Sequence, residues 1–129
     1  MIRVGVNARI LAKPQPTGMA RYTECLLKAL CERQAEGPEF EFVLFGVEQT
    51  PESIQNYEFV YNAEEFGSHS GLRAHLWEQI DLPRALRKHD LDLLHTPAGA
   101  PPVTSIPTVT TLHDISVITH PEWFSKRYA

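Results

Sequence analysis

The sequence lacks any apolar run approaching the roughly twenty residues that a membrane-spanning helix needs. Its first residues, Met1 to Val4, lack the basic stretch and long apolar core of a secretory signal. Cysteine is scarce as well. Only Cys25 and Cys31 occur, on one predicted helix where they point in different directions and cannot form an ordinary disulfide. We therefore expect a cytoplasmic protein whose cysteines are plain thiols.

Positive charge is not in excess. The chain has 12 lysines and arginines against 16 aspartates and glutamates, which gives a formal net charge of −4. A nucleic-acid-binding protein needs a clustered positive surface to neutralise phosphates, so this balance argues against one. With 43% hydrophobic and 22% charged residues, the composition is that of a globular domain, and it argues against disordered, collagen-like and coiled-coil classes.

The common motifs for phosphates and metals are also missing. There is no Walker motif. A dinucleotide site needs glycines directly after the first strand and an acidic residue at the end of the second, where Phe45-Gly46 stands. A receiver domain needs an aspartate where Tyr61-Asn62 stands. The pair of carboxylates at 90–92 lies at the start of a predicted strand, at the end of the sheet opposite to its ligand side, and indicates a turn entering that strand. We predict neither a metal nor a nicotinamide cofactor.

The first thirty residues contain a strand, a loop and a helix. Residues 2–7 are predicted as a buried parallel strand. A loop over 8–17 follows, and Thr17 is a suitable N-cap for a helix that begins at Gly18. The apolar face expected for this helix consists of Met19, Tyr22, Leu26, Ala29 and Leu30. Because an initial glycine leaves the helix N–H groups unhindered, we predict a phosphate or diphosphate site at Gly18.

Further strands and one helix are predicted downstream. The strands are expected at 40–45, 59–61, 91–94 and 108–112. The helix begins near Gly71, and Pro83 should kink or restart it. Its apolar residues at helical spacing are Leu72, Leu76, Ile80, Pro83 and Leu86. Helices between apolar strands indicate parallel crossovers, so the fold class is α/β, a Rossmann-like doubly wound sheet.

Ligands of such sheets bind beyond the carboxyl ends of the strands. With the usual order 3-2-1-4-5, Gly18, His95 after the fourth strand and His113-Asp114 after the fifth would line one crevice. An imidazole placed like that of His113 can hydrogen-bond a substrate hydroxyl, and a purely structural histidine is the alternative.

The second helix carries two features with alternative interpretations. Trp77 beside Glu78 is either a platform for a sugar or part of the packing of an amphipathic helix. The basic side chains on its outer side are either a solvated face or a peripheral contact with anionic lipid: Arg73, Arg84, Arg87 and Lys88.

Several motifs occur in order along essentially the whole chain. They are Gly5-Val6-Asn7-Ala8-Arg9, Thr17 to Thr23, Trp77-Glu78-Gln79 with Leu82-Pro83, Asp92 to His95, and Thr111 to Asp114 with His120 to Phe124. Together they resemble the N-terminal domain of family-four retaining glycosyltransferases, which have the GT-B fold of two Rossmann-like domains facing a cleft. The sequence departs from many relatives at Asn7, where they carry aspartate, and at Ala20, where a second glycine is frequent.

The resemblance implies transfer of a sugar from a nucleotide-sugar donor, with retention of configuration and usually without a metal. It implies that the backbone N–H of Gly18 lies at the donor diphosphate. It also implies that His113 is a catalytic residue that hydrogen-bonds the donor sugar near the reacting carbon. Further candidate substrate-binding residues are Asp114, Arg21, His95, Trp77 and Glu78. No cofactor is expected besides the nucleotide-diphosphate sugar, which is a co-substrate.

The resemblance further implies that residues 1–129 are an incomplete acceptor-side domain, because the family's C-terminal nucleotide-sugar-binding domain is not among them. We expect part of a glycosyltransferase acting on a glycan or lipid-linked acceptor, in the cytoplasm or at the inner face of the membrane. Its partner would be that domain or a separate chain. The alternative is a stand-alone carbohydrate or nucleotide-sugar binding module, or a partner subunit without catalysis of its own.

Overall fold

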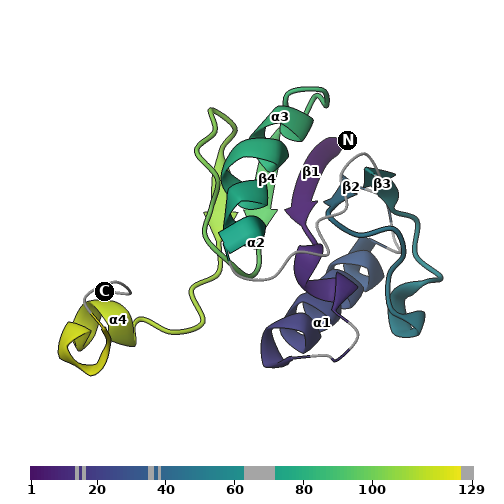
Figure 1. The fold of residues 1–129 in the computed structure, drawn as a ribbon. Helices are drawn as coiled ribbons and strands as arrows, with labels where there is room; N and C mark the ends of the chain where they lie inside the picture. Colours follow the sequence, from purple (N-terminus) through teal and green to yellow (C-terminus); the bar gives the residue numbers. More distant parts are fainter. Residues whose placement is uncertain (14, 16, 35–36, 38, 63–71, 126–129) are drawn as a thin grey trace.

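The computed structural model describes residues 1–13, 15, 17–34, 37, 39–62 and 72–125. One sheet of parallel strands, in the order β3-β2-β1-β4-β5, forms the centre of the molecule (Figure 1). The strands are β1 (Ile2–Asn7), β2 (Phe40–Phe45), β3 (Val60–Asn62), β4 (Leu93–Thr96) and β5 (Thr108–Thr110). The predicted α/β class, Rossmann-like sheet and strand order are confirmed.

β1 is the central strand of this sheet. It pairs with β2 along its whole length, from Ile2 opposite Phe40 to Asn7 opposite Phe45. On its other side it pairs with β4, where Val6 lies opposite His95. Because helices cover both faces of such a sheet, residues 42–45 of the neighbouring strand β2 are apolar and buried in succession.

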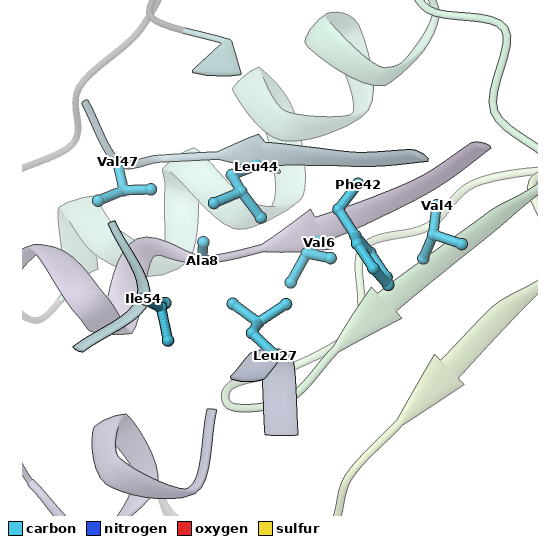
Figure 2. Packing of buried hydrophobic residues seen from close by; sticks show 8 residues of the cluster. All are labelled: Val4, Val6, Ala8, Leu27, Phe42, Leu44, Val47 and Ile54. Carbon is cyan, nitrogen blue, oxygen red and sulfur yellow. The ribbon is translucent and has the colours of Figure 1, made fainter. Parts of the chain in front are cut away.

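Helix α1 (Gly18–Arg33) covers one face of the sheet. Figure 2 shows Leu27 of α1 pointing toward Val6 of β1, in a cluster that also holds Phe42 and Leu44 of β2. The 3₁₀ turn η3 (Glu52–Ile54) completes this cluster through the fully buried Ile54. This core fixes the start of α1 relative to the carboxyl end of β1.

A second helical segment covers the opposite face. It consists of α2 (Leu72–Leu76), the π-helical turn η4 (Trp77–Asp81) and α3 (Leu82–Leu86). Its buried side chains pack against Val43, Phe45 and Leu94. Successive side chains of a strand point to opposite faces, so alternate residues of β2 serve the two cores.

The predicted apolar face of α1 was displaced from the true one. The buried residues are Ala20, Thr23 and Leu27, whereas Met19 and Tyr22 are exposed. Thr23 tolerates its buried position because its hydroxyl donates a hydrogen bond to the Met19 carbonyl at 2.9 Å.

The face expected for the second helix was also partly wrong. Leu72, Leu76 and Ile80 are exposed, and the largest buried side chains are those of Trp77, Leu82 and Leu86. The π-helical turn is the physical reason, because its wider turn interrupts the regular helical spacing. The predicted restart at Pro83 is confirmed, since α3 begins at Leu82 with proline in its first turn.

Some predicted boundaries were shifted. β3 starts one residue later than expected, β5 ends at Thr110, and β4 runs over Leu93–Thr96 instead of 91–94. The predicted loop at 8–17 contains the 3₁₀ turn η1 (Arg9–Ala12). After β5 the chain leads to α4 (Ser116–Thr119) and η5 (Pro121–Trp123), and Figure 1 shows α4 lying away from the sheet.

Candidate functional site

The carboxyl end of β1 holds a buried polar cluster. Asn7 is 1% exposed and Glu78, from the π-helical turn, is 4% exposed. The Oε1 atom of Glu78 accepts hydrogen bonds from Nη2 of Arg9 at 3.1 Å and from Nδ2 of Asn7 at 3.3 Å. The backbone N–H of Arg9 donates to Oδ1 of Asn7 at 3.4 Å. Two donors therefore compensate the burial of the Glu78 carboxylate.

The π-helical turn places two successive side chains, Trp77 and Glu78, in the interior. Trp77 packs with the core of α3, and its ring also lies against Gly46. Gly46 has φ +79°, and a Cβ there would lie 2.9 Å from Cη2 of Trp77. At 4% exposure the indole has no open face for a sugar, so it serves the packing of the helix.

The loop after β4 rests directly on the Glu78 carboxylate. Gly99 in this loop has φ +95°, and a Cβ at that position would lie 2.6 Å from Oε1 of Glu78. Only glycine adopts this conformation without strain while the backbone approaches the carboxylate so closely. Pro97 and Ala98, just before Gly99, are buried.

His113 lies at the same end of the sheet, after β5. Its Nε2 is 2.6 Å from the carbonyl oxygen of Pro97, in the loop that rests on Glu78. The edge of one ring meets the face of the other between His113 and Tyr22 of α1, with centroids 4.9 Å apart and planes at 88°. The Tyr22 hydroxyl is 3.3 Å from Oγ1 of Thr111. The loop after β5 is thus in contact with the beginning of α1.

The first turn of α1 has the predicted cap. The side chain of Thr17 accepts a hydrogen bond from the N–H of Ala20 at 3.3 Å, and its carbonyl accepts from Arg21 at 2.9 Å. Within the described residues, the N–H groups of Gly18 and Met19 have no hydrogen-bond partner. A Cβ at Gly18 would meet no atom of the described residues within 4 Å, so those residues leave space beside the first turn of α1.

A cavity of about 460 Å³ lies beside the beginning of α1. Ala20 and Glu24 of α1 line one side, and the segment 47–51 after β2 lines the other. Lys13 and Thr50 add a cation and a hydroxyl to its wall. Such a mixed lining suits a ligand that carries hydroxyl groups.

Two further predicted residues, Asp114 and Arg21, are exposed, and only the side chain of Asp114 has a hydrogen-bond partner among the described residues. Asp114 is exposed, and its carboxylate accepts a hydrogen bond from the backbone N–H of Ser116 at 2.7 Å, which lowers the pKa of Asp114. Arg21 is exposed, and its guanidinium has no partner among the described residues. Cys25 and Cys31 are free thiols, and burial raises the pKa of Cys31.

His95 does not lie beyond its strand, as predicted, but inside β4 opposite Val6 and Val109. It lines an apolar groove of about 210 Å³ between α1 and the sheet. Its Nε2 is buried and has no hydrogen-bond partner in the described part of the chain. Burial lowers the pKa of His95, and a contact with the Val109 backbone opposes this shift.

Sequence reasoning gave no role to several residues that build the site. Arg9 and Asn7 hold Glu78, Pro97 and Gly99 form the loop beneath His113, and Tyr22 was assigned to a buried face. The available signal was a polar residue at the end of a buried strand or just after it, as at Asn7 and Arg9. Nothing local to Pro97 or Gly99 indicates their partners.

Among the residues that the structure describes, no group of three or more histidine, cysteine, aspartate or glutamate side chains could hold a metal ion. None of the helices described has the length and apolar character needed to cross a membrane. No protein-family model matches the chain, and searches of curated proteins and of solved structures return no match. The class that the structure defines is therefore the Rossmann-like parallel α/β fold.

Proposed function

We propose that this chain is the acceptor-side half of a GT-B retaining glycosyltransferase, which moves a sugar from a nucleotide-sugar donor to a glycan or lipid-linked acceptor. A second Rossmann-like domain holds the nucleotide in this scheme. The observation that carries the proposal is the contact between Tyr22 and His113, because it joins the beginning of the glycine-opened helix to the loop after β5. In a nucleotide-sugar donor the diphosphate and the sugar are adjacent groups, so the diphosphate could bind at the beginning of α1 while the sugar contacts the loop after β5.

The first turn of α1 supports the role given to Gly18. A leaving diphosphate gains negative charge as the bond to the sugar breaks. The helix N-terminus carries a partial positive charge, and the unpartnered N–H groups of Gly18 and Met19 can donate to that anion. Donors that are fixed before the reaction stabilise developing charge without further reorganisation.

The exposed ring of His113 supports a role at the donor sugar. A hydrogen bond from a sugar hydroxyl to this ring orients the anomeric carbon relative to the acceptor. The cavity beside α1 supports an acceptor rich in hydroxyl groups, because Lys13, Glu24 and Thr50 line it. Arg21 contributes an exposed positive charge near the start of the same helix.

The substitution Gly18→Ala tests the proposal. A methyl group there meets no atom of the described part of the chain within 4 Å, so the fold is expected to remain intact while the approach to the helix N-terminus narrows. We expect inorganic pyrophosphate and UDP to shift the Gly18 and Met19 amide resonances of the wild-type chain in a ¹⁵N-HSQC titration. The variant should bind both probes several-fold more weakly.

Gly37→Ala is the matched control, since a methyl group at Gly37, beyond the C-terminus of α1, also meets none of the described atoms within 4 Å. It should bind both probes as the wild type does. Equal binding of the probes by the wild type and by Gly18→Ala would show that the diphosphate does not bind at Gly18. Binding without sugar transfer, in the presence of every donor-binding domain tried, would identify a binding module instead of half an enzyme.

A further inference from the structure

The carbonyl of Pro97 determines which ring nitrogen of His113 carries the proton. Nε2 of His113 lies 2.6 Å from that oxygen, and a carbonyl oxygen can only accept a hydrogen bond. Nε2 must therefore be the donor, and the lone pair of the neutral ring resides on Nδ1. Within the described residues Nδ1 has no hydrogen-bond partner, and the side chain is exposed.

The loop that carries the Pro97 carbonyl also lies against Glu78. Gly99, two residues along the same loop, approaches the Glu78 carboxylate so closely that a Cβ would lie 2.6 Å from Oε1. That oxygen is also the acceptor for Arg9 and Asn7, so it cannot withdraw without breaking hydrogen bonds in the interior. The loop therefore lies against a buried carboxylate that two hydrogen bonds hold in place.

We propose that Glu78 is a positioning residue. Acting through Gly99 and Pro97, it holds His113 in the Nε2–H tautomer and leaves Nδ1 free to accept a hydrogen bond. The meaning for catalysis rests on the proposed function: the neutral ring accepts a hydrogen bond from a hydroxyl of the donor sugar. The opposite tautomer would present an N–H at that place and would repel a hydroxyl hydrogen.

The tautomer is measured on the 129-residue chain, without donor, from the ¹⁵N chemical shifts of its histidine rings above the pH at which they protonate. A His113→Gln variant assigns the His113 signals by their loss. We expect a protonated Nε2, an unprotonated Nδ1 and slow solvent exchange of the Nε2 proton. A wild-type ring with the proton on Nδ1 overturns the proposal, and this result depends on no other variant folding.

Three substitutions then test the route through Glu78. Gly99→Ala should convert His113 to a mixture of tautomers and accelerate exchange of its Nε2 proton, because the loop must move away from Oε1. Glu78→Gln keeps the shape and an acceptor oxygen, and it should retain the wild-type tautomer. Gln79→Ala is the matched control, because Gln79 comes from the same π-helical turn and donates to the same loop, at the Pro101 carbonyl. It should leave His113 unchanged.

An unchanged His113 in a folded Gly99→Ala variant overturns the proposal, as does an equal change in Gln79→Ala. None of these measurements on His113 requires a nucleotide-sugar donor. A chain that shows the Nε2–H tautomer but fails to bind pyrophosphate would therefore contradict the proposed function and leave the role of Glu78 standing.

Discussion

Glu78 and Glu41 show at the residue scale how burial changes the value of an ion pair. Glu78 and Arg9 meet at 3.1 Å with side chains that are 6% and 16% exposed. Glu41 and Arg3 form their pair at about one-third exposure. Solvent and salt weaken an exposed pair, whereas removing one partner of a buried pair leaves the other charge in the interior.

We predict that Glu78→Ala lowers the free energy of unfolding by about 3 kcal/mol or more. The matched substitution Glu41→Ala should cost less than about 1 kcal/mol. Urea unfolding followed by circular dichroism measures both values. A similar cost for the two variants would contradict the interpretation of Glu78 as a buried, hydrogen-bonded carboxylate.

His95 contributes to stability in a way that depends on pH near neutrality. Its pKa is lowered in the folded chain from the usual 6.5, so the unfolded chain binds a proton at a higher pH than the folded one. Stability is therefore lost as the pH falls through about 6.5 toward the folded value, and it is regained as the pH rises.

His95→Leu should remove this loss, because leucine carries no titratable group and suits the apolar groove. We expect the variant to gain stability relative to the wild type as the pH is lowered from 7.5 to 5. The urea midpoints of both proteins at the two pH values provide the measurement. Parallel pH dependence in the two proteins would show that His95 titrates normally.

At the element scale, the start of α1 was specified locally and its buried face was not. Thr17 and Gly18 define the first turn through a cap hydrogen bond that needs no partner from outside the helix. The orientation of α1 about its axis follows from how Leu27 fits against β1 and β2. Met19 and Tyr22 are therefore free of the core, and Tyr22 contacts His113 instead.

Replacing the cap of α1 should weaken the fold without changing it. Thr17→Ala removes the acceptor of the Ala20 N–H and is expected to cost about 1 kcal/mol of stability. Thr17→Ser retains the hydroxyl and should cost only a fraction of that amount. Thermal unfolding of the wild type and the two variants measures their stabilities. Equal losses of stability in Thr17→Ala and Thr17→Ser would show that the cap hydrogen bond is not the cause.

At the scale of the whole molecule, the two tryptophans report on different regions. Trp77 is 4% exposed in the core beneath α3, whereas Trp123 is 68% exposed in η5. Trp123 also stacks on His120, with ring centroids 4.1 Å apart. The core and the segment after β5 are therefore separately observable by fluorescence.

In a Trp123→Phe variant, the remaining Trp77 should emit at short wavelength, resist quenching by iodide, and shift to longer wavelength on unfolding. Trp77→Phe should leave an emission that iodide quenches readily in the native state. Strong iodide quenching of Trp77 in a folded protein would contradict its burial. The urea midpoint checks that each variant is folded under the conditions used.

The sequence by itself determined the strands and the first helix with its cap, because these depend on short-range patterns of apolar residues, turn residues and N-cap chemistry. The order of the sheet was expected from the usual topology of such folds and not from a local pattern, and the structure has that order. It also indicated which loops lie at the ligand-binding ends of the strands, and so it indicated Gly18 and His113. β4 shows the limit of such patterns, because it runs over Leu93–Thr96 and not over the predicted 91–94. Its bounds depend on which of its backbone groups pair with β1 and β5.

Only the tertiary structure decided what surrounds these residues. The π-helical turn brings Glu78 inward to meet Arg9 and Asn7, and Gly99 then approaches the carboxylate from a third part of the chain. Each contact joins segments far apart in sequence, and its formation depends on packing that no local pattern encodes. The exposure of Met19 and the burial of Trp77 follow from the same cause.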